Sequence, residues 1–119
     1  MSAASHDNIL AQTSHLPHLL AYALLETLSS RGTNLEVLNF AAGSFRDFSR
    51  IAASDPIIWR DIFTANGSEV IKVLDRFLVE VSSLRQLVSD GDSDAMEEVF
   101  KRARKARKYY LEQFQEYDS

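Results

Sequence analysis

Three histidines, all near the start of the chain, are the first candidates for chemistry. His15 and His18 flank Pro17 in the segment SHLPH, and a spacing of three makes them neighbours on a helix. Two imidazoles at this spacing are compatible with a shared metal ion. The third ligand would then be His6, Asp7 or Glu26. Because metal sites usually show a denser cluster of ligands, we expect no metal here. A substrate-binding wall and a kink without chemical function remain open.

A helical projection of this segment separates a polar stripe from an apolar face. At about 100° per residue, the stripe contains Asp7, Ala11, Ser14, His18, Tyr22 and Leu25, with His15 at its edge. The opposite face carries Leu16, Leu19, Leu20 and Ala23 and is expected to be core. Contact with water readily explains Asp7 and Ser14, but it is a less satisfactory explanation for a histidine and a tyrosine flanked by apolar residues.

The second candidate is the segment GSFRDFSR. Phe45, Phe48 and Ala52 share one side of a helix. Gly43, Arg46, Asp47 and Arg50 project to the other. A glycine inside a helix costs roughly 1 kcal/mol relative to alanine, so Gly43 needs a reason. Either its missing side chain lets a ligand approach beside Arg50, or a helix begins at 43 and Asp47 and Arg50 form a surface ion pair.

Two further features have simple structural explanations. Trp59 shares a helical spacing with Ile62 and Phe63, which is typical of a core or an interface. The basic run KRARKARK at 101–108 suggests a nucleic acid or a membrane surface. Its charges also fit a solvated helix face, because three pairs at a spacing of four are available. These pairs are Glu97–Lys101, Glu98–Arg102 and Lys108–Glu112. We therefore expect neither nucleic acid nor membrane as a partner.

Composition limits the classes of function. The chain has 119 residues, a net charge of −4 and no cysteine, which excludes thiolate ligands and cysteine nucleophiles. No apolar run approaches the roughly 20 residues of a membrane span. No GxGxxG or GxxxxGK[ST] phosphate loop occurs. Therefore we do not expect the chain to bind a dinucleotide by itself in the usual way.

The hydrophobic periodicity predicts one all-α domain, 1–119, of five to six helices. The first helix begins at His6 with Ser5 as its N-cap, kinks or restarts at Pro17 with Ser14 as a second cap, and ends near Arg31 and Gly32. Helices follow at 34–40, at 41–54 and from Pro56, which fits a first helical position. The last two, from about Ser68 and after Gly91, should form an antiparallel pair. Their apolar seams are richer than one hairpin needs, which indicates a partner chain.

Two blocks of the chain, HDNILAQTSHLPHLLAYAL and FAAGSFRDFSRIAASDPIIWRDIFTAN, resemble the C-terminal helical domain of the prephenate dehydrogenases. That family includes arogenate and cyclohexadienyl dehydrogenases. The resemblance runs from about Ser5 to the last helix, although the final helices match only in pattern. It implies oxidation of prephenate or arogenate by NAD or NADP, with loss of carbon dioxide, on the route to tyrosine. It also implies an interlocked homodimer and a preceding Rossmann domain that holds the nucleotide and the catalytic histidine.

The resemblance also implies functions for individual residues. Arg50 would grip a substrate carboxylate, which suits a bidentate guanidinium. His18 would line the pocket and be linked to tyrosine inhibition. Other motif positions near the substrate are matched by His6, Asp7, Ser14, His15, Gly43, Asp47 and Trp59. Ser44 stands where a second glycine is frequent, which would narrow the approach beside Arg50.

The resulting expectation is a fragment that forms the dimerisation and substrate-closing domain of a cytoplasmic dehydrogenase. The short lead MSAAS is not an expected domain start. Alone, the fragment should be inactive, without a catalytic residue, a cofactor or a metal of its own. The competing hypothesis is a free-standing helical module that binds tyrosine or a partner helix.

Overall fold

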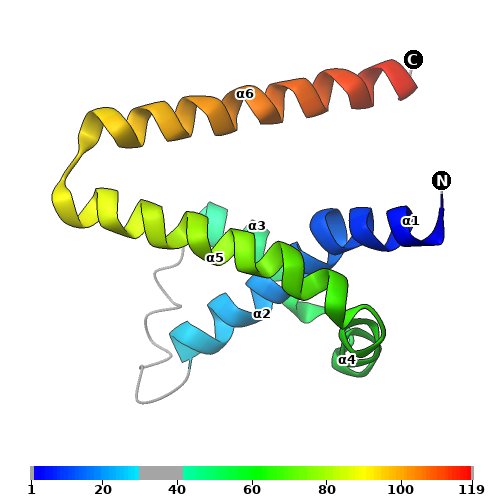
Figure 1. Cartoon of the computed structure of the whole chain (residues 1–119). Helices are drawn as coiled ribbons and strands as arrows, with labels where there is room; N and C mark the ends of the chain where they lie inside the picture. Colours follow the sequence, from blue (N-terminus) through cyan, green and yellow to red (C-terminus); the bar gives the residue numbers. More distant parts are fainter. Residues whose placement is uncertain (1, 30–41, 119) are drawn as a thin grey trace. The chain divides into compact units, whose positions relative to one another are not determined.

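The computed structural model describes residues 2–29 and 42–118, with side chains as far as residue 114. Every regular element in these ranges is a helix, so the predicted all-α class is confirmed (Figure 1). The chain divides into two compact units, Met1–Arg76 and Phe77–Ser119. The helix predicted at 34–40 and the helix end predicted near Arg31 lie outside the described residues.

The first helical stretch consists of α1 (Ala3–Leu10), a π-helical turn η1 (Ala11–His15) and α2 (Leu16–Ser29). It begins earlier than predicted, because the N-cap is Ser2 and not Ser5. The Ser2 hydroxyl accepts a hydrogen bond from the Ser5 amide at 3.1 Å. One orphan amide of the first turn is thereby satisfied.

The chain passes Pro17 without restarting. The amide of Leu16 donates to the carbonyl of Ala11, five residues earlier, which is the hydrogen bond of a π-helix. Proline cannot occupy a regular α-helical interior without losing a hydrogen bond and crowding the preceding turn. The wider turn just before Pro17 accommodates both effects. Ser14 lies inside this turn, so the prediction that it caps a second helix is wrong.

The π-turn also changes which residues face the core. An extra residue in one turn rotates everything before it relative to everything after it. Ala11, predicted on the polar stripe, is fully buried, and His15 is buried with only 8% of its surface exposed. Leu16 and Leu19 pack against the core as predicted, around buried Val70 and Val73.

The following segment covers α2. It consists of α3 (Gly43–Ser49) and a 3₁₀ turn η3 (Arg50–Ala53), and both contact α2. The hydroxyl of Tyr22 donates to the carbonyl of Ser54 at 2.9 Å, which ties α2 to the end of η3. We refer to Gly43–Ala53 as the α3–η3 segment.

Helix α4 (Pro56–Ala65) begins as predicted. Pro56 occupies the first turn, and the carboxylate of Asp55 accepts a hydrogen bond from the amide of Ile57 at 2.9 Å. Asn66 ends α4, and α5 (Gly67–Asp90) follows directly. Phe63 of α4 packs against the core of the first unit.

In the second unit, Gly91 adopts φ of 65° and ends α5, and α6 (Ser93–Asp118) follows (Figure 1). The predicted turn residue is therefore confirmed. The ion pair predicted between Glu97 and Lys101 is also formed, at 3.3 Å. No side chain between residues 77 and 114 is buried. The large apolar residues that stay exposed there are Leu78, Val79, Val81, Val88, Phe100, Tyr109, Tyr110, Leu111 and Phe114.

Five residues of the predicted apolar seams are thus exposed in the described part of the second unit: Val81, Val88, Phe100, Tyr110 and Phe114. Isolated apolar surface residues are normal, but a row of them along a helix marks an interaction surface. None of the helices in the described part of the chain is long and apolar enough to cross a membrane.

Candidate functional site

Two histidines and the single tryptophan meet in the first unit. The imidazole of His18 stacks on the indole of Trp59, with ring centroids 3.6 Å apart and planes inclined by 17°. His15 meets the same indole edge to face, at 5.9 Å and 80°. We call these three residues the histidine–tryptophan cluster. Trp59 is thus half-buried against polar rings, where its spacing alone indicated a core or interface residue.

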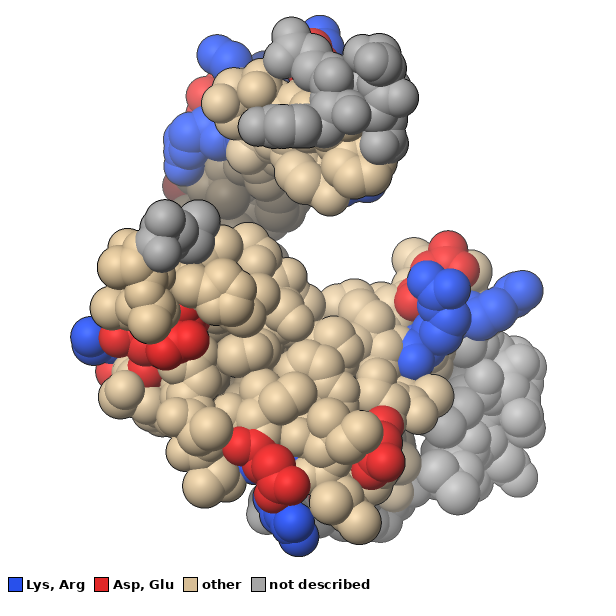
Figure 2. Space-filling model, turned by 90° about the vertical axis from the view of Figure 1, so that its right-hand side faces the viewer, with Lys and Arg blue, Asp and Glu red and all other residues tan. Residues whose placement is uncertain are grey.

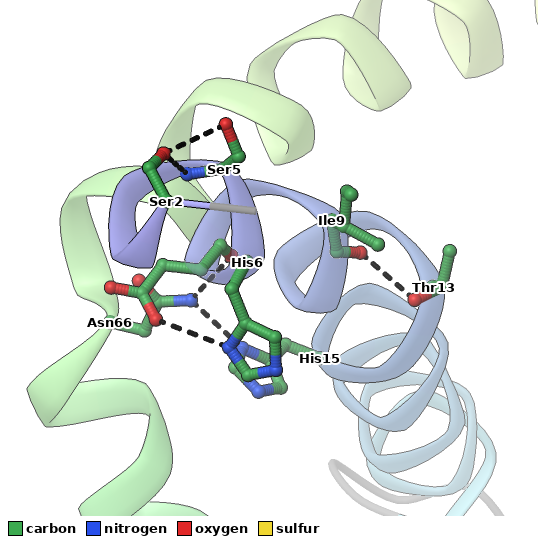
Figure 3. A network of polar contacts seen from close by, with 8 residues as sticks. Ser2, Ser5, His6, Ile9, Thr13, His15 and Asn66 are labelled. Carbon is green, nitrogen blue, oxygen red and sulfur yellow. Dashed lines mark hydrogen bonds and ion pairs between the residues drawn. The ribbon is translucent and has the colours of Figure 1, made fainter.

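His15 is held by an asparagine that belongs to none of the predicted sites. The side-chain nitrogen of Asn66 lies 3.2 Å from Nδ1 of His15 and 3.0 Å from the carbonyl oxygen of Asp7 (Figure 3). The turn between α4 and α5 therefore connects α1 to the cluster. Burial lowers the pKa of His15 below its usual 6.5, and the neighbouring His18 lowers it further, whereas Asp7 acts in the opposite direction.

His18 has a different hydrogen bond. Its Nδ1 lies 2.8 Å from the carbonyl oxygen of Ser14. Because a carbonyl only accepts, Nδ1 must carry the hydrogen, which leaves Nε2 for another partner. Ser14 thus contributes its backbone to the cluster by orienting the ring that stacks on Trp59.

The HD pair lies at the margin of the cluster. The Nδ1 of His6 is 4.0 Å from the carboxylate of Asp7, and both side chains are more than half exposed. Asp7 reaches the cluster through its backbone carbonyl, which binds Asn66. Exposed pairs of this kind add little to stability, so the carboxylate and imidazole are free to meet other groups.

The α3–η3 segment carries the remaining predicted residues. Gly43 is the first residue of α3, so the alternative of a helix boundary is correct. An added Cβ there would meet no atom of the described residues within 4 Å, so packing among these residues does not require a glycine. Asp47 and Arg50 are exposed, and these two described residues form no ion pair with each other. The predicted surface pair is therefore wrong.

The structure brings together some predicted residues and separates others. His15, His18, Trp59, Ser14 and Asp7 are connected by the contacts above. Gly43, Asp47 and Arg50 share the other segment, which contacts α2, the helix of His18. Among the described side chains, at 2–29 and 42–114, no three histidine or carboxylate groups gather as a metal site would require. On the face of the molecule in Figure 2, charged side chains are scattered around a broad uncharged area.

Asn66 is the site residue that the sequence analysis did not identify. An asparagine in the segment NGS, between two helices, is typical of a turn. Its side chain is then expected to hydrogen-bond the backbone of the turn itself. The sequence offers one further indication that Asn66 belongs to a site: its side-chain amide follows α4 directly and could therefore reach a neighbouring helix. Which helix it reaches depends on packing between residues far apart in sequence.

The first unit is all-helical and places two imidazoles against one indole, one stacked and one edge to face. These features define the class as a helical domain with a polar aromatic cluster. Residues 2–102 match the family described as "Prephenate dehydrogenase, dimerization domain". The chain therefore belongs to the family of prephenate dehydrogenase dimerisation domains. The matched range includes every residue of the cluster and of the α3–η3 segment.

Individual relatives agree with this assignment. The chain is 42% identical over 109 residues to cyclohexadienyl dehydrogenase of Zymomonas mobilis, covering 90% of this chain and 37% of that protein. It is 36% identical over 108 residues to prephenate dehydrogenase of Bacillus subtilis, covering 90% of this chain and 29% of that protein. The chain thus spans about a third of these relatives.

Solved structures show the same fold. Prephenate dehydrogenase of A. aeolicus, in complex with hydroxyphenyl propionate and NAD+, matches with a TM-score of 0.81 at 37% identity. The match covers 90% of this chain and 38% of that one. Arogenate dehydrogenase of Synechocystis matches with a TM-score of 0.83 at 25% identity, covering 92% and 41%. These relatives favour a dehydrogenase domain over the free-standing regulatory module.

Proposed function

We propose that this chain is the dimerisation and substrate-closing domain of an NAD- or NADP-dependent prephenate or arogenate dehydrogenase. Such an enzyme oxidises and decarboxylates its substrate in tyrosine synthesis. The observation that carries the proposal is the histidine–tryptophan cluster inside the range that matches the family. The relative from A. aeolicus is described with hydroxyphenyl propionate, an aromatic carboxylic acid.

The cluster suits a flat, oxygen-bearing ligand. The stacked pair of His18 and Trp59 offers a planar apolar surface, and His18 keeps Nε2 for a hydrogen bond. Arg50 is exposed on η3 and supplies a guanidinium suited to a carboxylate. Gly43 and Asp47, on the same segment, would complete this part of the pocket, with His6, Asp7, Ser14 and His15 on the other side. Tyrosine is the proposed inhibitor, because it has an aromatic ring and a carboxylate, as hydroxyphenyl propionate does.

The nucleotide requires residues from outside this chain. Dinucleotide sites of the usual kind use a strand, a glycine-rich turn and a helix. The described residues contain helices only. NAD or NADP is therefore assigned to a separate Rossmann domain of the same cytoplasmic enzyme, together with the catalytic histidine, and no residue of this chain is assigned to the cofactor.

The second unit is proposed to form the homodimer. Its exposed apolar residues lie on α6 and on α5 from Leu78 onward. Burying such rows between two copies is the usual way to form an obligate interface. Exchange of Phe100 and Tyr110 for glutamate should convert a dimer to monomers in light scattering. A Lys105→Glu exchange, at an exposed basic position of α6, is the matched control and should leave the dimer intact.

The function is tested by following reduction of NAD or NADP with prephenate and with arogenate. The chain alone should give no turnover, whereas the chain joined to its Rossmann domain should be active with at least one substrate. Turnover by the chain alone, or none by the joined protein with either substrate, would contradict the proposal.

A further inference from the structure

We propose that Asn66 is a positioning residue that fixes His15 as a neutral imidazole with its hydrogen on Nε2. His15 then serves as a permanent hydrogen-bond donor to an oxygen acceptor of the bound ligand. The proposal depends on the proposed function for the identity of this ligand. The state of His15 itself is a property of the chain without ligand.

The orientation of the Asn66 amide follows from its neighbour on α1. The atom that faces the carbonyl oxygen of Asp7 at 3.0 Å must be the amide nitrogen, because a carbonyl cannot donate. The same nitrogen lies 3.2 Å from Nδ1 of His15. Its two hydrogens therefore serve two acceptors, and Nδ1 must be one of them (Figure 3).

An accepting Nδ1 fixes the whole ring. A neutral imidazole has one donor and one acceptor, so the hydrogen is on Nε2. An imidazolium would place an N–H of the ring against an N–H of Asn66. The other groups facing His15 are His18 and Asp7, while α4 contributes the uncharged rings of Trp59 and Phe63.

The Nε2–H group is available to a ligand. In the described residues no fully buried side-chain nitrogen or oxygen lacks a hydrogen-bond partner. Since no group in the described part of the chain bonds Nε2 of His15, this atom keeps contact with solvent among these residues. A buried ring with one exposed donor, in edge contact with the rings of Trp59 and Phe63, is preorganised for an oxygen acceptor.

The first experiment reads the tautomer directly. Long-range ¹H–¹⁵N spectra of histidine-labelled protein distinguish the two ring nitrogens, and His15 is assigned with a His15→Gln variant. We expect an unprotonated Nδ1 in the wild type at neutral pH. Asn66→Asp replaces the donor by an acceptor and should move a hydrogen onto Nδ1. Asn8→Asp is the matched control, because it removes the hydrogen bond that the side-chain amide of Asn8 donates to the carboxylate of Glu69. This exchange should leave the tautomer of His15 unchanged.

The second experiment measures function. With hydroxyphenyl propionate as probe, Asn66→Asp should weaken binding to the full dehydrogenase about tenfold and make it depend on pH between 6 and 8. In a His15→Gln background the same exchange should have no further effect, because Asn66 acts through His15. A purely structural contribution would persist in that background and would overturn the proposal.

The outcomes separate the two proposals. A protonated Nδ1 in the wild type, or an unchanged tautomer in Asn66→Asp, overturns the inference whatever the enzyme does. A correct tautomer in a protein without dehydrogenase activity supports the positioning of His15 and contradicts the proposed function. If Asn66→Asp does not fold by circular dichroism, Asn66→Ala replaces it. That variant should show a new fraction of Nδ1–H, and its absence overturns the inference equally.

Discussion

The histidine–tryptophan cluster and the α3–η3 segment both carry predicted site residues, but they hold them differently. In the cluster, His15 and His18 have ring contacts to Trp59 and hydrogen bonds that fix their orientation. In the segment, Arg50 and Asp47 are exposed and not paired with each other. Side chains that are held by contacts within the chain should contribute both to the free energy of unfolding and to ligand binding. Exposed charged side chains without such contacts should affect ligand binding alone. Substitutions in the two regions should therefore have separable effects.

The largest effect is expected for Arg50→Ala. Loss of a charge-assisted bidentate contact of about 3 kcal/mol corresponds to roughly a 100-fold increase in KM for prephenate. The KM for the nucleotide and the free energy of unfolding should change little, because Arg50 is exposed. Steady-state kinetics of the full dehydrogenase measure the two KM values, and urea unfolding measures the free energy of unfolding. Arg46→Ala, in the same segment, is the control, and an unchanged KM in Arg50→Ala would remove Arg50 from the site.

Trp59→Ala tests the histidine–tryptophan cluster, where a substitution should reduce stability. The indole contacts His15, His18 and Phe63, so its removal should lower the free energy of unfolding by about 2 kcal/mol, below the range for fully buried tryptophans. Since Trp59 is the only tryptophan, unfolding is followed by circular dichroism. Ile58→Ala, at a neighbouring position that is 55% exposed, should cost less than about 0.5 kcal/mol. Equal losses in the two variants would refute a stabilising cluster.

Tyr22→Phe links the two regions. Its hydroxyl bonds the carbonyl of Ser54 just after η3, and loss of this partly buried bond should cost about 1 kcal/mol. If the bond also positions η3, the KM for prephenate should rise modestly in the same variant. Tyr109→Phe, at a position that is 65% exposed, is the control for unfolding and should behave as wild type.

The smallest effect is a pH dependence from His15. Its folded pKa is lowered, so the unfolded chain takes up the proton first as the pH falls through 6.5. The contribution to stability is therefore complete above pH 6.5 and decreases below it. Urea unfolding between pH 5 and 8 should show this decrease, and His15→Gln should reduce it. His6→Gln, which replaces an exposed ring, is the control and should leave the pH dependence of the free energy of unfolding unchanged. A pH dependence that is the same in His15→Gln and the wild type would contradict the contribution of His15.

Much of the fold follows from local sequence. Asp55 with Pro56 begins α4, and Gly91 ends α5, because capping and positive φ depend on a few adjacent residues. The apolar periodicity predicts the helical class for the same reason. The site formed by the polar residues near Pro17 stays a prediction. The projection placed Ala11 on the polar stripe and His15 at its edge, whereas both are buried, because it used a regular α-helix where the structure has a π-turn.

By itself, the sequence determined the helical class, the start of α4 at Asp55 and Pro56, the end of α5 at Gly91 and the two blocks that resemble a dehydrogenase domain. Only the tertiary structure decided that a π-turn precedes Pro17, that His15 is buried, and that Trp59 and Asn66 meet the histidines. The physical reason is range. Caps and periodicity are set by neighbours in the chain, whereas ring stacking, burial and a tautomer depend on which distant residues the packing brings into contact.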